Sequence, residues 1–493
     1  MKLFITRWIL WLSVLCFMAE GDCQLVKSGW LKMRHLSDSG PTSNAINDIL
    51  VVGNAVWVAA GSGLSRTADL GLSWTQVTPS NGLGRGGVSA LAERNGVIWV
   101  ATAFDTTVVE GAALPAGGGL SYSADGGNTW RWIPQPVDSR DETEYAPTTT
   151  NIQNVTYDIA LTDSAVWIAS WGGGLRRSTD MGETWEVVTV DGLPFDVSNN
   201  NFIHMAFSVR YDGENLWAGS AAGIHKSTDG GETWTTFSHQ NQPEGISGNH
   251  VVAIGNQENG GREVVWAATG KTMDETEIHG VSKSEDGGLT WTVPIEEIRA
   301  WNFAFDDSVV YVATDEGLFK SLDWGDTWAV FPQIVDAETG ETVLSEAVYS
   351  VAIGPGRSLW VGSSDGLALT LDDGATWKIF RAFQVPGQDG APQTYAYPNP
   401  FSPLRHNVYG WDGHVRFQYR ASRPTRVTVK IYDFGMNLVK TVVEEKIRPA
   451  GGDFTEVWDG RNDLGEMVAN GVYFYKITLS DQQPLWGKVM VVN

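Results

Sequence analysis

Asp48, Asp158 and His204 occupy the same predicted position in three of the short β-rich segments that recur along this sequence. Two carboxylates with a histidine nearby can act as a general acid and a general base, the chemistry that glycoside hydrolysis uses. No motif fixes the distances between these side chains, and the same residue types suit the lining of a hydrated channel. The sequence favours a channel lining and keeps catalysis as the alternative.

Two acidic loops carry oxygen ligands of the kind that Ca²⁺ prefers. The residues concerned are Asp141, Glu142 and Glu144 in the first loop, and Asp274, Glu275 and Glu277 in the second. Acidic residues are also common in solvated surface loops, and that interpretation is favoured. Apart from Ca²⁺ no cofactor is predicted, because no phosphate-binding loop, thiolate cluster or nucleophile motif is found.

Trp171 and Trp301 are candidate ligand-binding residues, and Asn302 is included as the polar neighbour of Trp301. An exposed indole ring can stack on a sugar. Core packing explains most of the 23 tryptophans. Trp171 precedes three glycines, which offer few side-chain atoms to bury it.

The elements that position these residues follow from a unit that recurs seven times, as in Ser227-Thr-Asp-Gly-Gly-Glu-Thr-Trp234. The seven aspartates are Asp69, Asp125, Asp180, Asp229, Asp286, Asp323 and Asp372. A carboxylate can accept backbone N–H bonds in a tight turn, and glycine supplies positive φ. We therefore predict a structural role for these aspartates. A repeat of roughly 40 to 50 residues indicates a propeller or a solenoid.

Each unit is predicted to form four strands, which gives an all-β, seven-bladed propeller. The second strands resemble Val56–Ala59, and each third strand begins at a glycine such as Gly63. A strand that begins at Trp30, or the one that begins at Trp377, is predicted to complete the last blade and close the ring.

The first strands are predicted to line the central channel, since one of their aligned columns is mostly polar. That column contains Asp48, Ser89, Asp158, His204, Asn302 and Ser350. Strand parity places almost all long insertions on the rim opposite the aspartate turns, here called the decorated rim. These insertions are 102–118, 134–153, 191–201, 238–249, 269–279 and 332–346. Binding residues concentrate on such loops, so the decorated rim is the predicted functional face.

Residues 1–21 are predicted to be a cleaved signal peptide. Lys2 and Arg7 precede an apolar run from Trp8 to Ala19 that is too short to cross a bilayer. An uncleaved anchor and a lipid attached to Cys23 are the alternatives. We expect no membrane span after cleavage, no disulfide framework, and a secreted protein or one on the outer cell surface.

The net charge of −24 lies entirely in the first part of the chain. Residues 394–493 hold 12 Lys and Arg against 10 Asp and Glu, so residues 1–393 hold 22 against 48. This field repels nucleic acid, and favours cations or basic partners.

Residues 28–383, with their seven aspartate turns, resemble the BNR/Asp-box β-propellers. This group includes sialidases, sortilin-type receptors, xyloglucan-active glycosidases and a photosystem II assembly factor, so the resemblance implies a fold without one activity. The chain lacks the Phe/Tyr-Arg-Ile-Pro segment of sialidases. It has one predicted propeller, where xyloglucan-active enzymes usually pair two, and its acidic balance differs from the basic patch of the photosystem factor.

Residues 384–394 are rich in Pro, Gly and Gln and are predicted to be a linker. Residues 395–493 resemble the FlgD-type Ig-like domain and the C-terminal sorting domains of type IX secretion. The matching segments are Tyr397–Phe401, Val429–Asp433, Trp458–Asn462, Gly465, Asn470–Tyr475 and Lys488–Val489. The resemblance implies a β-sandwich that engages the type IX secretion machinery.

Together these patterns favour a noncatalytic binding protein over an enzyme. The predicted ligand of the decorated rim is a polysaccharide or a cell-surface protein. The alternative is a polysaccharide-degrading glycoside hydrolase or lyase that uses carboxylates at the channel mouth.

Overall fold

A computed structural model of the chain describes residues 40–107, 113–142, 145–197, 201–388, 390–409, 412–480 and 482–492. The predicted signal peptide and the strand predicted at Trp30 lie outside these residues, as does Glu144. The described residues form two compact units. One contains Gly40–Glu341 and Ala347–Phe380, and the other contains Thr342–Glu346 and Arg381–Asn493.

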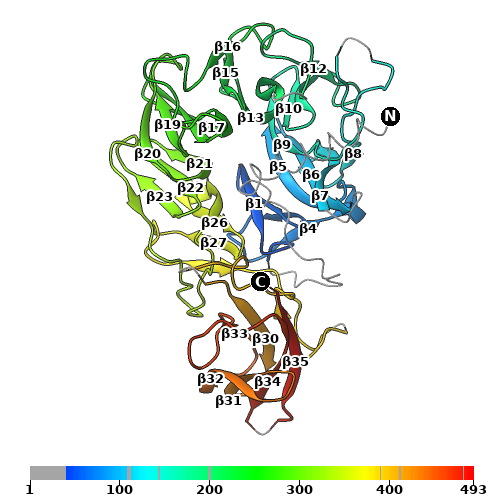
Figure 1. Ribbon diagram of the computed structural model, residues 1–493, viewed down its shortest axis with the longest axis vertical. Coiled ribbons are helices and arrows are strands. Elements are labelled where there is room, and N and C mark those ends of the chain that lie inside the picture. The colour runs from blue at the N-terminus through cyan, green and yellow to red at the C-terminus, as the bar shows by residue number, and fades with distance from the viewer. Residues whose placement is uncertain are drawn as a thin grey trace. The chain divides into compact units, whose positions relative to one another are not determined.

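The first unit is a seven-bladed β-propeller in which each blade is an antiparallel sheet of four consecutive strands (Figure 1). Blade 1 contains β1 (Ile46–Val52), β2 (Ala55–Ala60), β3 (Gly63–Thr67) and β4 (Thr75–Val77). Blade 2 contains β5 (Gly87–Arg94), β6 (Val97–Thr107), β7 (Ala113–Ser123) and β8 (Arg131–Ile133). Blade 3 contains β9 (Thr156–Leu161), β10 (Val166–Ser170), β11 (Gly174–Ser178) and β12 (Glu186–Val188). Blade 4 contains β13 (Ala206–Tyr211), β14 (Leu216–Ser220), β15 (Gly223–Ser227) and β16 (Thr235–Phe237). Blade 5 contains β17 (His250–Asn259), β18 (Arg262–Gly270), β19 (Gly280–Ser284) and β20 (Thr292–Glu296). Blade 6 contains β21 (Ala300–Asp306), β22 (Val309–Thr314), β23 (Gly317–Ser321) and β24 (Ala329–Val330). Blade 7 contains β25 (Val348–Ile353), β26 (Leu359–Ser363), β27 (Gly366–Thr370) and β28 (Lys378–Phe380).

Helical structure in the described residues consists of three short 3₁₀ turns: η2 (Pro79–Asn81), η3 (Phe202–His204) and η4 (Pro355–Arg357).

Blade 7 is completed by β28, the strand that follows Trp377, as one of the two predicted alternatives requires. Each described blade therefore consists of consecutive strands. The ring closes through apolar side chains, since Ile46 and Val58 of blade 1 share a buried cluster with Trp360 and Leu367 of blade 7. Burial of this apolar surface stabilises the closed ring.

The aspartate turns are held by the same hydrogen bonds in every blade. In blade 4, Asp229 Oδ1 accepts from Ser227 Oγ at 2.8 Å and from the Thr233 N–H at 2.9 Å. Asp229 Oδ2 accepts from Thr233 Oγ1 at 2.6 Å. The Gly231 N–H donates to Ser227 Oγ at 2.8 Å. These hydrogen bonds, led by the one from Thr233 Oγ1, lower the pKa of Asp229 to about 2.

Each turn also joins its blade to the preceding one. Gly231 of blade 4 packs against the ring of Trp167 in blade 3, where a Cβ on the glycine would lie 2.3 Å from a ring atom. Trp234 meets Trp167 edge to face at 6.2 Å. Equivalent tryptophan pairs join blade 2 to 1, blade 6 to 5 and blade 1 to 7. Turn chemistry within one blade thus determines packing between blades.

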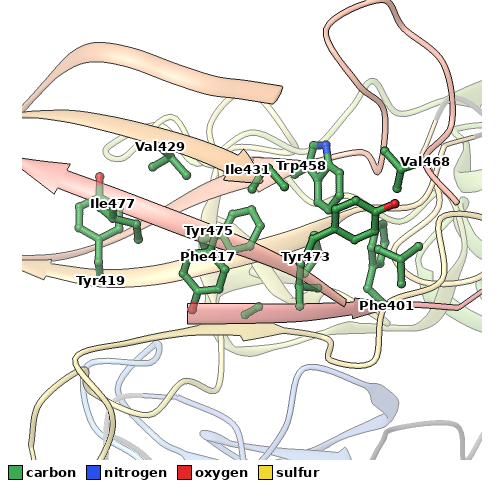
Figure 2. Packing of buried hydrophobic residues seen from close by; sticks show 14 of the residues in the cluster. Phe401, Phe417, Tyr419, Val429, Ile431, Trp458, Val468, Tyr473, Tyr475 and Ile477 are labelled. Atoms are coloured by element: carbon green, nitrogen blue, oxygen red, sulfur yellow. The ribbon is translucent and has the colours of Figure 1, made fainter. Parts of the chain in front are cut away.

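The second unit is a β-sandwich of two sheets. One contains β29 (Thr394–Tyr397), β30 (Val415–Ala421) and β33 (Gly452–Trp458), and the other contains β32 (Leu438–Arg448), β31 (Thr425–Tyr432), β34 (Gly471–Leu479) and β35 (Leu485–Val491). Alternate side chains of both sheets fill the core, as Figure 2 shows for Phe417, Val429, Ile431 and Tyr475.

The two glycines of one aspartate turn provide a test of the joint between blades. Gly230 (φ +76°) has open space around its Cα, whereas Gly231 (φ +93°) abuts Trp167. We expect Gly230→Ala to cost about 1 kcal/mol through backbone strain alone, and Gly231→Ala to cost roughly 2 to 4 kcal/mol because the ring must also move. Denaturant unfolding followed by near-UV circular dichroism measures both costs, and equal costs would contradict the packing role.

Candidate functional site

All seven innermost strands contain a β-bulge near their first residues. In β1, for example, Ile46 pairs with Ala60 and Asp48 with Ala59, which leaves Asn47 unpaired. The residues left out of register are Asn47, Ser89, Tyr157, Phe207, Val252, Trp301 and Tyr349. A bulge redirects a side chain out of the alternating pattern of its strand. The seven bulges therefore place one redirected residue per blade around the channel.

These bulge residues line a central cavity of about 870 Å³. Four of them are aromatic, and we call Tyr157, Phe207, Trp301 and Tyr349 the aromatic mouth. Tyr157 stacks on Phe207 at 5.8 Å, and Trp301 meets Tyr349 edge to face at 6.0 Å. All four side chains are half-buried. They present ring surface to the cavity that the blades do not cover.

The aromatic mouth lies at the rim that carries the long connections. The end of β2 pairs with the start of β1, so the bulges lie beside the turns from second to third strand. Connections between blades, such as 134–155 and 238–249, end at the same rim because they lead into the first strands. The opposite rim has short turns such as 53–54.

Asp48 and Asp158 also line the cavity, and each directly follows a bulge residue. Asp158 Oδ1 accepts from the Ile159 N–H at 2.8 Å, and Oδ2 accepts from the Val209 N–H of blade 4 at 2.9 Å. Asp48 likewise accepts from Ile49 at 2.8 Å and from the Leu91 N–H of blade 2. Both carboxylates therefore connect their blade to the next one.

Asn302 has the same position in blade 6, and its Oδ1 accepts from the Val351 N–H of blade 7 at 3.4 Å. It lies beside Trp301 in the cavity lining. The polar group after the bulge thus acts as an acceptor between blades in three of the seven blades.

Burial raises the pKa of both carboxyls. The pKa of Asp48 rises to about 6 and that of Asp158 to about 7, although backbone N–H groups partly oppose the shifts. The negative charge of Asp48 adds to the rise at Asp158, and Arg210 reduces it. Both carboxyls therefore hold a proton to a higher pH than an exposed aspartate does.

The prediction that His204 lies on an innermost strand is wrong. His204 ends η3, and β13 begins only at Ala206. Its Nε2 is 2.9 Å from Asp191 Oδ1, its ring stacks on Phe195 at 5.7 Å, and it is 4% exposed. The position equivalent to Asp48 in blade 4 is Ser208. The 3₁₀ turn and the bulge add residues that a strict period of two does not anticipate.

Other members of the polar column are also displaced. Ser89 is the bulge residue of blade 2, so Ala90 takes the place equivalent to Asp48. Asp48, Ser89, Asp158 and Asn302 line the cavity, whereas Ser350 is fully buried.

The two tryptophans chosen from the sequence lie in different places. Trp301 lines the cavity, and its Nε1 donates to Asp315 Oδ1 at 2.7 Å. Trp171 is half-buried in the turn between β10 and β11, outside the lining of the cavity. Glycine follows Trp171 because the turn packs closely: a Cβ on Gly173 would lie 2.3 Å from Asn154 Oδ1.

The acidic loops have hydrogen-bonding partners of their own. Glu277 is completely buried and accepts from Asn249 Nδ2 and from the Thr272 N–H, both at 2.6 Å. Asp274 accepts from the N–H and the hydroxyl of Thr276. The bond from Asn249 joins the loop before β17 to the loop before β19, and the others lie within the second loop.

Asp141, Glu142 and Glu275 are exposed. Within the part of the chain that the structure describes, no group of three or more His, Cys, Asp and Glu side chains is placed to hold a metal ion. Over the same residues, no helix is both long and apolar enough to cross a membrane.

Tyr157, Phe207 and Tyr349 were not identified from the sequence as site residues. A weak signal exists, because Tyr157, Trp301 and Tyr349 all begin an aligned first strand. The bulges that turn them toward the cavity depend on pairing with the second strand, which the sequence of one strand does not encode.

Comparison with known proteins supports the architecture of both units. Residues 406–483 match the FlgD Ig-like domain. The fold is similar to that of a GH74 enzyme from Niastella koreensis, with a TM-score of 0.52 and 17% identity over 93% of this chain and 74% of that one. An ancestral GH74 enzyme gives a TM-score of 0.51 and 15% identity over 92% of this chain and 63% of that one.

YCF48 from Cyanidioschyzon merolae gives a TM-score of 0.44 and 16% identity over 68% of this chain and 97% of that one. No curated protein matches the chain. At 15 to 17% identity the likeness to the two GH74 enzymes concerns the fold alone.

The raised pKa of Asp158 predicts a pH dependence of stability. Since its folded pKa of about 7 exceeds the ordinary 3.8, the folded protein holds a proton that the unfolded chain has released. This contribution is complete below about pH 4 and is lost as the pH rises through about 7.

We therefore expect Asp158→Asn to flatten the fall in unfolding free energy between about pH 4 and 8. The substitution also removes one acceptor of a backbone N–H, which lowers the unfolding free energy equally at every pH and leaves this slope unchanged. Asp229→Asn is the control, because its pKa of about 2 leaves the slope over that range unchanged. Urea titrations at several pH values measure both, and an unchanged slope in Asp158→Asn would contradict the assignment.

Proposed function

We propose that this chain is a noncatalytic binding protein that recognises a polysaccharide or a surface protein at its decorated rim. The observation that carries the proposal is the aromatic mouth, where the redirected residues of four blades border an 870 Å³ cavity with aromatic rings. Half-buried aromatic rings in a concave, mostly preformed site are typical of ligand recognition.

The hydrogen bonds of the carboxylates favour binding over catalysis. Asp48 and Asp158 each accept two backbone N–H groups, one of them from the next blade. A general acid must move its proton to a substrate, and these side chains are oriented toward the backbone of the ring. Their location therefore supports a role in holding the blades together.

We further propose that the chain is exported and that residues 395–493 engage the type IX secretion machinery, with 384–394 as the linker. The signal-like residues 1–21 and the FlgD Ig-like match at 406–483 support this proposal. The expected location is the outer cell surface or the medium.

The binding proposal predicts loss of ligand when the mouth is altered. Full-length protein is applied to a glycan array and to a panel of purified surface proteins, alongside Trp301→Ala and Trp132→Ala. Trp132 is 50% exposed on the outermost strand of blade 2 and serves as the control. We expect Trp301→Ala to bind about tenfold more weakly, because one ring stack is lost, and Trp132→Ala to bind normally. Saturable binding that is equally strong in Trp301→Ala and in the unaltered protein would exclude the aromatic mouth as the binding site.

A polysaccharide hydrolase is the second candidate, since two carboxyls that line one cavity, Asp158 and Asp48, have pKa values raised to about 7 and about 6. If it holds, plant or algal polysaccharides are cleaved, and Asp158→Asn lowers turnover by roughly a hundredfold or more. Reducing-end assays on a substrate panel measure this. Turnover that survives both Asp48→Asn and Asp158→Asn would exclude these carboxyls.

Export is tested in a host that has type IX secretion. We expect the full chain to reach the surface or the medium, and a chain truncated after residue 394 to remain inside the outer membrane. Immunoblots of the cell fractions distinguish the two, and normal export of the truncated chain would contradict a sorting role.

A further inference from the structure

The lining of the cavity carries more acidic than basic side chains. Its lining includes five carboxylates, from Asp48, Glu93, Asp158, Glu258 and Asp307, and two guanidinium groups, from Arg94 and Arg210. Arg94 forms an ion pair with Asp163 at 2.8 Å. Both arginines come late in their strands, toward the short-turn rim, whereas Asp48 and Asp158 adjoin the bulges. Glu93, Glu258 and Asp307 also come late in or just after their strands, so the end nearest the aromatic mouth presents two carboxyls, Asp48 and Asp158, together with the rings.

The aromatic rings form two arcs beside these carboxylates. Tyr157 and Phe207 form one arc, and His250 meets Phe207 at 4.2 Å. Trp301 and Tyr349 form the second arc, with Asp315 accepting from the Trp301 indole at 2.7 Å. The face of an aromatic ring attracts a cation, most strongly where water is partly excluded. Rings and carboxylates at one opening thus attract the same kind of group.

We infer that the aromatic mouth binds a cationic side chain, Lys or Arg, on an exposed basic segment of a partner protein. The inference rests on the proposed function and specifies its ligand. The side chain enters between the two arcs, where Trp301 and Tyr349 offer aromatic rings and Asp48 and Asp158 offer carboxyls that a bound cation would keep ionised. An ammonium or guanidinium group also has N–H donors for the lone pairs that the backbone leaves unused.

The net charge of residues 1–393, which include the propeller, acts in the same direction. Residues 1–393 hold 48 acidic against 22 basic side chains, so a basic segment is attracted before contact. An anionic polysaccharide is repelled by the same field. A neutral glycan can stack on the rings and donate hydroxyl hydrogen bonds to the carboxylates, but it gains nothing from the net negative charge, so the observations favour a basic protein segment.

The test is isothermal titration of the full-length protein at physiological salt with an oligo-lysine peptide and with the same peptide acetylated on every side chain. We expect saturable binding of the first and none of the second. Trp301→Ala and Asp48→Asn should each weaken binding about tenfold. Tyr157→Leu tests the other arc. Circular dichroism confirms that each variant is folded.

Controls separate the mouth from general attraction to an acidic surface. Glu214→Gln removes one exposed charge on the short-turn rim, and Trp132→Ala removes an exposed ring away from the cavity. Both should bind the peptide within roughly twofold of the unaltered protein. Equal losses in Glu214→Gln and Asp48→Asn would show unspecific attraction and overturn the inference.

A further comparison distinguishes this inference from the proposed function. Neutral xyloglucan oligosaccharides and oligo-uronates are titrated into the same proteins. Binding of either one that depends on Trp301, without binding of oligo-lysine, would overturn the inference and leave the binding function standing. If no ligand binds differently to the variants of the aromatic mouth and to the unaltered protein, both the inference and the proposed function are overturned.

Discussion

The propeller depends on one repeated contact, between the aspartate turn of each blade and a large apolar side chain of the blade before it, a tryptophan or a phenylalanine in every case. The turn is rigid because its carboxylate accepts three hydrogen bonds, and its glycine lets the backbone approach an indole ring that no side chain would permit. Trp57, Trp99, Trp167, Trp217, Trp266 and Trp360 are at most 2% exposed. A local hydrogen-bonding motif thereby becomes the interface between sheets.

At the channel, a second kind of contact takes over. Polar side chains after the bulges accept N–H groups from the neighbouring blade, as Asp158 does from Val209. Blades are thus joined through aromatic packing at the short-turn rim and through hydrogen bonds around the channel. Two of the bulge residues join blades as well, since Asn47 donates to the Val88 carbonyl and Ser89 to the Thr156 carbonyl, both at 2.7 Å. The aromatic bulge residues line the cavity instead.

Burial of the channel carboxyls stores an electrostatic cost within the ring. Asp48 and Asp158 lose solvation, and each raises the energy of the other when both are ionised. A cation at the aromatic mouth would reduce this cost, so the same carboxyls can serve the structure of the ring and the affinity for a basic partner.

The all-β class, the seven blades, the aspartate turns and the Ig-like domain could be predicted from the sequence, because each rests on local turn chemistry or on a contiguous pattern. The sequence also placed Asp48, Asp158, Trp301 and Asn302 near the channel. The tertiary structure alone decided that His204 lies off the first strand and that Tyr157, Phe207 and Tyr349 join Trp301 at one opening. A bulge exists only relative to a paired strand, and a ring of residues drawn from seven blades exists only once the circle has closed.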